Sequence, residues 1–583
     1  MRNLFYLIPF LFVLAISAGA QTVSRTPVSE PFTIDKGTSF SASPGGRITS
    51  TSNTTPPVAL QITSDVLEAL DVIRNNHVGG KNLDPRAVVK SSISSMLAEL
   101  DPHSVYFDAA EFTELLGEHE SEYSGTGSTI SNFVKNGRIE TYVLATQPGS
   151  AAAKADLHYG DRIIAVNGER VVGLTIDVVR DKIRGPRGTV VRLTVEKAVT
   201  GKTETVEMRR ERVSQPSITN YSVLRDGVGY IALSNGFTHT TTNELNVAMS
   251  ELYRRGMTSL ILDLRSNSGG ILDQAIEVAE KFLPAGRAII LQRGRYKSEE
   301  RLWTSRNRKP EKVPLVVLVD EHTASASEVV AGALQDNDRA LIVGQRTFGK
   351  GLVQNVVQLP MGSGLTITTA RYFTPSGRSI QRHYEGSGRY DYFMNRSAEE
   401  KSGIATRTIS NRPVHSDSGI APDVVTETEA YNAGRAALID PIFFFVRELI
   451  SEKVRGKHAT EVSSKDNIRQ SIIFGTDPMP SDTVARFRDF VRKGPWHVSS
   501  ALLDREVSFI QRQLRYQLTL AAFGPDSAEL VLVASDNQIS QAINALPQAS
   551  ILAKAAARIR IHGKDKKARR VAFPAGQGRN RRN

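Results

Sequence analysis

The sequence contains no cysteine among its 583 residues. This absence excludes disulfides, thiol nucleophiles and cysteine-ligated metal sites. After residue 20 no segment reaches the ~18 consecutive apolar residues of a membrane-spanning helix. We therefore expect a chain without an integral membrane span and without thiol catalysis.

A net positive charge is also nearly absent from most of the chain, although the formal net charge of the whole chain is +12. Between Lys554 and Arg582 there are eleven Lys and Arg residues against a single acid, Asp565. This tail accounts for most of the net charge, so the rest of the chain is near neutral. A basic tail of this kind is more often a solvated segment than a specific binding site, and no nucleic-acid partner is predicted.

The N-terminus has the pattern of a secretory signal. Arg2 precedes an apolar run from Leu4 to Ile16, and the small residues 17–20 (SAGA) end in an Ala-x-Ala cleavage pattern. We expect cleavage near Ala20, followed by a Ser-, Thr- and Pro-rich linker. The predicted location of the mature protein is the periplasm.

The most informative stretch runs from Val313 to Gln354. An apolar strand runs into a turn of small residues around Ser325, and a helix follows. Such a junction exposes a small polar side chain beside the N–H groups of a helix start. Lys350, between two glycines, can act as a base only when neutral, and lowering a Lys pKa to near 7 costs roughly 4–5 kcal/mol, which burial can supply.

The segments 323–336 (TASASEVVAGALQD) and 346–354 (RTFGKGLVQ) resemble the C-terminal processing peptidases, also called tail-specific proteases. The resemblance implies that Ser325 is the nucleophile, Lys350 the general base and Gln354 the residue that orients Lys350. On a fully extended strand the backbones of residues 350 and 354 lie ~13 Å apart, so this last contact needs a turn or leaning side chains. Asp336 is expected to bind a nearby arginine such as Arg339 rather than to react.

A second glycine turn lies upstream, where the strand and helix of residues 259–283 meet at Gly269 and Gly270. Helix starts leave N–H groups unpaired, which suits an oxyanion. The resemblance assigns this turn, with the N–H of Ala326, to the oxyanion hole. We expect Asp263, Arg265 and Asn267 to brace the turn.

Residues 146–175, with the hairpin signal Asn167-Gly168, resemble a PDZ domain. The preceding loop of Gly125, Thr126, Gly127 and Ser128 takes the position that receives the terminal carboxylate of a peptide in PDZ domains. A glycine-rich turn can offer several N–H groups to one anion, and the next strand offers an edge for strand addition. The alternative is a plain glycine turn without a ligand.

The expected fold class is multidomain α+β. Its parts are a helical N-terminal region, a PDZ-like β-rich domain, an α/β protease core of the crotonase/Clp-like ββα type, and a helical C-terminal region. The expected boundaries are 1–20 for the signal peptide, 21–58 for a disordered linker, 59–120 for the N-terminal helices, 121–200 for the PDZ-like domain, 201–430 for the peptidase core, 431–550 for the C-terminal helical domain and 551–583 for the basic tail.

The predicted function is an exported serine endopeptidase that needs no metal and no cofactor. Its substrates are proteins or peptides with free C-termini, and the helical regions are candidates for self-association or adaptor binding. One alternative is a catalytically silent PDZ-bearing scaffold. Another is a Ser-His-Asp hydrolase using His322 or His103, which is disfavoured because G-x-S-x-G is absent and His103 follows Asp-Pro at a turn.

Overall fold

The computed structural model describes residues 57–118, 122–384, 392–393, 403, 405–416, 418–427, 432–455, 479 and 482–559. The predicted signal peptide, nearly all of the linker and the basic residues beyond 559 lie outside the described residues.

The protease core is built on a six-stranded sheet in the order β10 (Ile218–Val223), β11 (Val228–Leu233), β12 (Ser259–Asp263), β15 (Leu315–Val319), β16 (Leu341–Gly344) and β21 (Val424–Val425). All neighbours are parallel except β10 and β11. Every residue of β11, β12, β15 and β16 is buried. Continuous apolar strands of this kind need cover on both faces.

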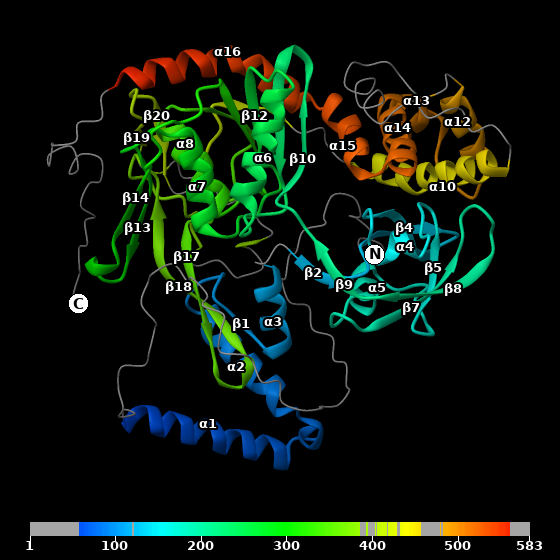
Figure 1. Cartoon of the computed structure of the whole chain (residues 1–583). Helices are drawn as coiled ribbons and strands as arrows, with labels where there is room; N and C mark the ends of the chain where they lie inside the picture. Colours follow the sequence, from blue (N-terminus) through cyan, green and yellow to red (C-terminus); the bar gives the residue numbers. More distant parts are fainter. Residues whose placement is uncertain are drawn as a thin grey trace.

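Helices cover both faces of this sheet. One face packs against α6 (Thr241–Arg254), α7 (Leu272–Phe282) and α8 (Ala326–Asp336), and the other against α16 (Asn537–Arg558), as Figure 1 shows. Leu260 and Leu262 of β12 pack toward the first set of helices, whereas Ile261 packs toward α16. This alternation follows from the two-residue period of a strand.

A second sheet flanks the core in the order β1 (Val105–Phe107), β18 (Gly364–Phe373), β13 (Ala288–Gly294) and β14 (Arg301–Thr304), with β17 (Leu352–Gln358) also paired to β18. The three-residue strand β1 connects the N-terminal region to this sheet. Only helices were predicted for that region, because three residues are too short to show an alternating pattern.

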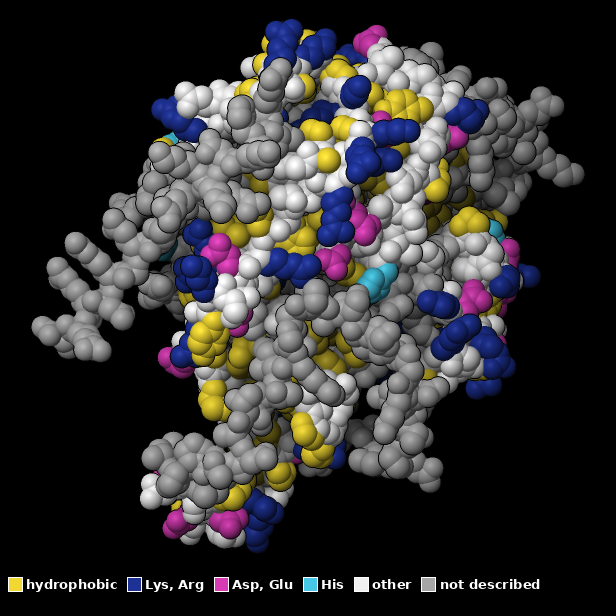
Figure 2. Space-filling view, turned by 60° about the vertical axis from the view of Figure 1, so that its left-hand side comes forward, with side chains coloured by type: hydrophobic (Ala, Val, Ile, Leu, Met, Phe, Trp, Pro, Cys, Tyr) yellow, Lys and Arg dark blue, Asp and Glu magenta, His cyan; other side chains and the backbone are white. Residues whose placement is uncertain are grey.

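The N-terminal region contains α1 (Pro57–Asn76), the short 3₁₀ helix η1 (Gly80–Asn82), α2 (Pro85–Ala98) and α3 (Ala109–Glu118). Helix α1 lies at the lower edge of the molecule in Figure 1, and apolar side chains are visible on its surface in Figure 2. The apolar side chains that predicted the helix are half exposed rather than buried, so the described residues do not cover them.

The PDZ-like domain is a sheet in the order β3 (Ser128–Lys135), β4 (Arg138–Thr146), β5 (Arg162–Val166), β7 (Val190–Glu196) and β8 (Thr203–Arg209), with β6 (Glu169–Arg170) on β5. Two helices, α4 (Ala151–Lys154) and α5 (Ile176–Ile183), cover it. A two-stranded sheet of β2 (Glu122–Gly125) and β9 (Glu211–Ser214) leads into and out of the domain. Strand β3 is the edge of its sheet.

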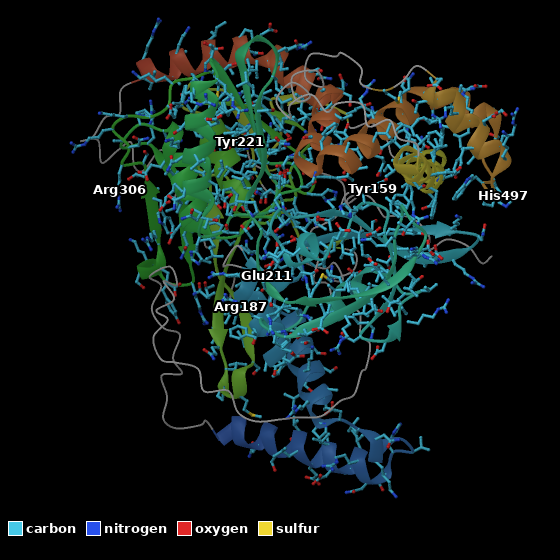
Figure 3. The ribbon with its side chains drawn as sticks, turned by 45° about the vertical axis from the view of Figure 1, so that its right-hand side comes forward. Tyr159, Arg187, Glu211, Tyr221, Arg306 and His497 are labelled. Atoms are coloured by element: carbon cyan, nitrogen blue, oxygen red, sulfur yellow. The ribbon has the colours of Figure 1, made fainter. Side chains whose placement is uncertain are left out.

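The C-terminal region consists of α10 (Ala433–Arg455), α12 (Thr483–Lys493), α13 (Ser500–Arg505), α14 (Val507–Phe523), α15 (Pro525–Ala534) and α16. Helices α10 and α14 pack on the PDZ-like sheet, and α12 and α13 pack on these two helices. The rings of Phe133 and Phe443 stack at 3.6 Å, and Tyr159 Oη donates to Gln517 Oε1 at 2.7 Å (Figure 3). Helix α16 returns to the protease core and ends at Arg558, past the residue 551 at which the sequence placed the start of the tail.

Smaller elements complete the described chain: the 3₁₀ turns η2 (Arg225–Gly227), η3 (Lys297–Glu299) and η4 (Pro360–Gly362), and the hairpin of β19 (Ala405–Arg407) and β20 (Pro413–His415). Within the described residues, none of the helices combines the length and the apolar character needed to span a membrane.

Candidate active site

Ser325 is the residue immediately before α8, at the end of the turn that follows β15. Its backbone is left-handed, with φ 56° and ψ −117°, although it is not a glycine. Strained serines at a strand-to-helix turn are typical of nucleophiles, because the turn lifts the hydroxyl off the sheet edge. The Ser325 side chain is accordingly partly exposed on an otherwise buried helix.

Glu328 is the fully buried carboxylate that organises this turn. One oxygen, Oε2, accepts the backbone N–H groups of both Ser325 and Lys350 at 2.8 Å. The other, Oε1, accepts from the Gly349 N–H at 2.7 Å and the Thr347 hydroxyl at 2.5 Å. The amide nitrogens of Ser325 and Lys350 are therefore at most twice 2.8 Å apart.

Glu328 was not predicted from the sequence as a site residue. The signal that could have found it is the S-x-x-E spacing of Ser325 and Glu328, which is typical of a helix N-terminus. In this protein the glutamate also reaches across to a second loop. Burial raises the pKa of the Glu328 carboxyl, and its four hydrogen bonds oppose that rise.

Lys350 lies in the turn before β17. The turn is held by hydrogen bonds from Arg382 N to Gly349 O, from Tyr372 N to Gly351 O and from Gly351 N to Gln381 Oε1. Glycine is required at 351 because an added Cβ would lie 2.6 Å from the Gln381 amide nitrogen. The two glycines thus let the chain pack tightly on both sides of the lysine.

Burial lowers the pKa of the Lys350 ammonium, and the negative charges of Glu328 and Asp101 oppose this effect. A lowered pKa is what a lysine needs in order to act as a base near neutral pH. Among the described residues, no hydrogen bond joins Ser325 Oγ to Lys350 Nζ. Catalytic hydrogen bonds are often loose in unliganded sites and tighten when substrate binds.

Gln354 lies on β17, where the pairing with β18 is irregular between Val353 and Gln354. Its Nε2 donates to the carbonyl oxygen of His103 at 2.5 Å, and no hydrogen bond joins it to Lys350. Gln354 therefore ties the active-site strand to the 101–104 loop of the N-terminal region. Asp101 of this loop supplies one of the negative charges that act on Lys350.

The glycine turn lies directly against the serine. A Cβ added at Gly269 would be 2.7 Å from Ser325 Cβ and 3.0 Å from Ala326 N. The Gly269 N–H donates to Asn267 Oδ1 at 2.9 Å, so it is already used. The N–H groups of Gly270 and Ala326 have no acceptor among the described residues, so both could donate to an oxyanion.

Three side chains brace the turn. Asn267 is fully buried. Its Nδ2 donates to Leu233 O at 2.7 Å, and its backbone carbonyl oxygen accepts the N–H of Ala324 at 2.9 Å. Asp263 pairs with Arg265 at 2.6 Å. These contacts are structural, and they fix the glycine turn relative to the serine turn.

Asp336 is fully buried and forms an ion pair with Arg378 at 2.8 Å. The prediction that Arg339 is the partner of Asp336 was wrong. The Arg339 guanidinium instead donates to the carbonyl groups of Phe282, Glu311 and Val313. The backbone beyond α8 turns away, so the arginine nearest in sequence is not the nearest in space.

Of the two histidines considered as bases, one contacts aromatic side chains and the other lies near a carboxylate. His103 is buried, its Nε2 lies 3.0 Å from Tyr392 Oη, and its ring contacts Phe348 and Tyr392 edge-on. The side chain of His322 is 39% exposed, and its Nε2 lies 3.6 Å from the Glu321 carboxylate.

The loop of residues 125–128 leads from β2 into the edge strand β3. Thr126 and Gly127 are buried, and their carbonyl oxygens accept Ala152 N and Gln147 N at 2.8 Å. Ser128 Oγ lies 3.0 Å from Thr126 Oγ1. Among the described residues, the N–H groups of Thr126 and Gly127 have no acceptor. Buried unpaired N–H groups are rare, and they suit an anion.

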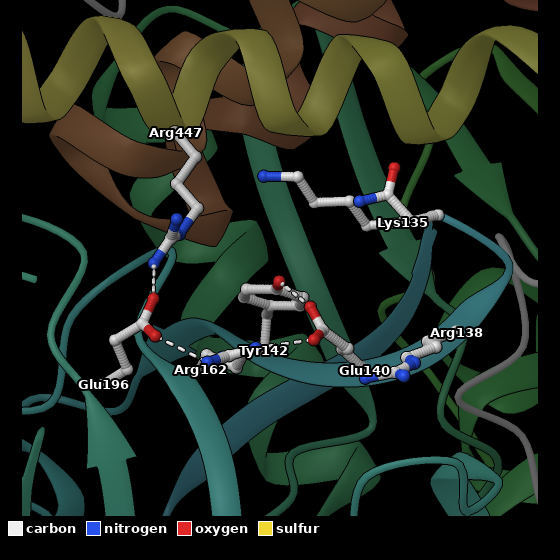
Figure 4. Close-up of a pocket in the computed structure, with 8 residues that line it drawn as sticks. Lys135, Arg138, Glu140, Tyr142, Arg162, Glu196 and Arg447 are labelled. Carbon is white, nitrogen blue, oxygen red and sulfur yellow. Dashed lines mark hydrogen bonds and ion pairs between the residues drawn. The ribbon is translucent and has the colours of Figure 1, made fainter. Parts of the chain in front are cut away.

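A cavity of about 520 Å³ lies between the PDZ-like sheet and α10 (Figure 4). Arg162 bridges Glu140 and Glu196 in it, and Arg447 of α10 pairs with Glu196 at 3.0 Å. None of the predicted site residues lines this cavity. Its ion pairs tie the C-terminal helices to the PDZ-like sheet.

Comparison with known proteins agrees with the two parts of the site. The model of peptidase family S41 matches residues 227–386, and that of the PDZ domain matches residues 142–197. The carboxy-terminal-processing protease of Bartonella bacilliformis is 36% identical over 303 residues, which cover 51% of this chain and 68% of that protein.

Two further relatives are carboxyl-terminal-processing proteases of cyanobacteria. The protein of Picosynechococcus sp. is 33% identical over 305 residues, covering 52% of this chain and 72% of its own length. The protein of Synechocystis sp. is 36% identical over 296 residues, which cover 50% of this chain and 68% of that protein. The chain therefore belongs to the carboxyl-terminal-processing proteases of peptidase family S41, and it is a serine-type peptidase with a PDZ domain.

Proposed function

We propose that this peptidase is an exported endopeptidase that uses Ser325 and Lys350 as nucleophile and general base and recognises substrates by their C-termini. The observation that carries the proposal is the single buried carboxylate of Glu328, which accepts the backbone N–H groups of both residues. The lowered pKa of Lys350 and the contact of Gly269 with Ser325 support the same assignment.

The chemistry follows from these positions. Neutral Lys350 takes the proton of Ser325 Oγ as the oxygen attacks the scissile carbonyl carbon. The N–H groups of Gly270 and Ala326 hold the negative oxygen of the tetrahedral intermediate. The lysine then returns the proton to the leaving amine, and water hydrolyses the acyl-enzyme by the reverse sequence.

Gln354 is proposed to orient Lys350. Its Oε1 accepts no hydrogen bond among the described residues, whereas its Nε2 is anchored to His103. The anchored amide thus has an acceptor available for the ammonium of Lys350 when the substrate orders the site.

The PDZ domain is proposed to bind the substrate's terminal carboxylate at residues 125–128. The unpaired N–H groups of Thr126 and Gly127 would receive the carboxylate, and the substrate would add as a strand to the β3 edge. The signal-like N-terminus supports export to the periplasm. The exposed apolar side chains of α1 support self-association through the N-terminal helices.

The test is cleavage of an unfolded reporter with an apolar, free C-terminus by the wild type and by Ser325→Ala and Lys350→Ala. We expect both variants to lose turnover while they keep the wild-type circular dichroism spectrum. An amidated reporter is expected to raise KM, because it lacks the carboxylate. A Lys350→Ala variant as active as the wild type would refute the Ser/Lys mechanism, and an inactive wild type that still binds the reporter would favour the scaffold alternative.

A further inference from the structure

The start of α16 reaches into the loop that carries the oxyanion glycines. Asp536, the N-cap of α16, accepts a hydrogen bond through Oδ2 from Arg265 Nη1 at 2.6 Å. The same Nη1 atom donates to Gln538 Oε1 at 2.7 Å. Both acceptors lie about 270 residues after Arg265 in the chain, and both belong to the C-terminal helical region.

Arg265 depends on these partners. The other side of its guanidinium is bound by Asp263, which also accepts from Tyr230 Oη at 2.9 Å, and only 19% of the Arg265 side chain is exposed. A guanidinium stays charged at every pH compatible with folding, so a largely buried one needs hydrogen-bonded acceptors on each side. Among the described residues, Asp536 and Gln538 are the acceptors on the side of the guanidinium that faces away from Asp263.

From Arg265 the contacts lead directly to the proposed oxyanion turn. The next residue, Ser266, has a left-handed backbone and donates its N–H to Asp320 at 2.9 Å. Asp320 also accepts the N–H of Thr323, which lies two residues before Ser325. Asn267 then binds the N–H of Gly269. A shift of Arg265 would therefore be passed to both turns that surround Ser325.

We propose that Asp536, assisted by Gln538, is a positioning residue that holds the oxyanion turn through Arg265, so that the C-terminal helical region completes the active site. This inference rests on the proposed assignment of Gly270 and Ala326 to the oxyanion hole. It adds a role for residues outside the segment 227–386 matched by the peptidase family.

The two oxygens of Asp536 have separate tasks, which makes the proposal testable. Oδ1 caps α16 by accepting Gln538 N at 2.7 Å, whereas Oδ2 binds Arg265. Asparagine is as good an N-cap as aspartate, but its amide nitrogen cannot accept from a guanidinium. Asp536→Asn therefore removes the contact with Arg265 and keeps the cap, and Asp536→Ser does the same with a shorter side chain.

The experiment measures kcat and KM of the full chain with the free-C-terminus reporter, together with the affinity for a peptide aldehyde and for the uncleaved product peptide. The aldehyde forms a hemiacetal with Ser325, and its oxygen occupies the oxyanion site, whereas the product probes ground-state binding alone. We expect kcat and aldehyde affinity to fall together by about 10- to 100-fold in both variants, with KM and product affinity within about twofold.

Asp84→Asn, at the N-cap of α2, is the matched control because Asp84 caps Arg86 N in the same way and is remote from the glycine turn. Unchanged kcat in Asp536→Asn and Asp536→Ser would overturn the inference. So would a parallel loss of kcat, product affinity and thermal stability, since that pattern indicates a merely structural role. Ser325→Ala tests the proposed function separately from the role of Asp536. If Ser325→Ala stays active, the proposed Ser/Lys mechanism fails, irrespective of the result for the Asp536 variants.

Discussion

At the scale of single residues, the site depends on one buried carboxylate. In Glu328→Gln the amide oxygen can replace one carboxylate oxygen, but the amide nitrogen would face N–H donors that then have no acceptor. An orphaned buried donor costs about 1–3 kcal/mol, so we expect a loss of stability of that size in urea unfolding. We also expect kcat/KM to fall by about 100-fold, because the backbones of Ser325 and Lys350 lose their common anchor.

Glu321→Gln is the control for this prediction, because Glu321 is close in sequence but its side chain is 47% exposed. Unfolding in urea and kcat/KM would be measured on both variants. A Glu328→Gln enzyme with the stability and kcat/KM of the wild type would show that the carboxylate does not anchor the pair.

Lys350 determines the pH dependence. The base must be neutral, so kcat/KM is expected to rise with pH through the pKa of Lys350 and to level off above it. Because burial lowers this pKa, the rise should occur below the pH at which an ordinary lysine loses its proton. The measurement is the pH profile of kcat/KM. Lys350→Arg should stay charged throughout and lose at least about 1,000-fold in activity at every pH.

How far sequence predicts single residues is visible at this site. The local pattern of a strand, a small-residue turn and a helix start singled out Ser325, and the resemblance of residues 346–354 added Lys350. The hydrogen bond of Gln354 to His103 could not be predicted, because it joins residues 251 positions apart. The irregular pairing of β17 with β18 beside Gln354 was equally hidden in the sequence. The Asp336–Arg378 pair was missed for the same reason.

At the scale of elements, α10 closes one end of the PDZ edge strand. Asp440 of α10 accepts the outward N–H of Val134 at 3.1 Å, and burial raises the pKa of the Asp440 carboxyl to about 6. An aspartate in the unfolded chain has a pKa of ~3.9. The raised pKa of Asp440 therefore stabilises the folded state below that pH, and this stabilisation is lost as the pH rises through about 6. Asp440→Asn keeps the acceptor without the charge.

We therefore expect Asp440→Asn to raise the melting temperature at pH 8, where the gain can reach about 3 kcal/mol, and to leave it unchanged at pH 4. Thermal unfolding of both proteins at the two pH values checks this expectation. Asp482→Asn, at the exposed start of α12, is the control. Equal shifts at pH 4 and pH 8 would contradict the titration of Asp440.

The element scale also shows which helices and strands sequence could reveal. The apolar runs of β12 and β15 predicted strands, and their residues are all buried because helices cover both faces of the sheet. Strand β1 was too short to be recognised. The docking of α10 and α14 on the PDZ sheet was also beyond reach, because a helical period shows that a face is apolar and not which surface covers it.

At the scale of the whole molecule, the N-terminal helices leave apolar surface uncovered. Val66, Leu67, Val72 and Ile73 of α1 are 46–60% exposed, and the helix lies along one edge of the molecule (Figure 1). Half-exposed apolar side chains along a 20-residue helix are typical of an interface, and burial of apolar area contributes about 25 cal/mol per Å². The proposed self-association would cover this surface with a second copy of the chain, in which the same helix supplies the same apolar side chains.

We expect the mature protein to sediment as an oligomer at micromolar concentration and Leu67→Lys to shift it toward the monomer, because the charge must be desolvated at the interface. Glu68→Lys adds a lysine one position away at an exposed polar residue and should leave the oligomer intact. Sedimentation velocity distinguishes the species. A wild type that remains monomeric at 100-fold higher concentration would refute self-association, whereas equal dissociation by both lysine variants would place the effect in the net charge of α1 rather than in its apolar face.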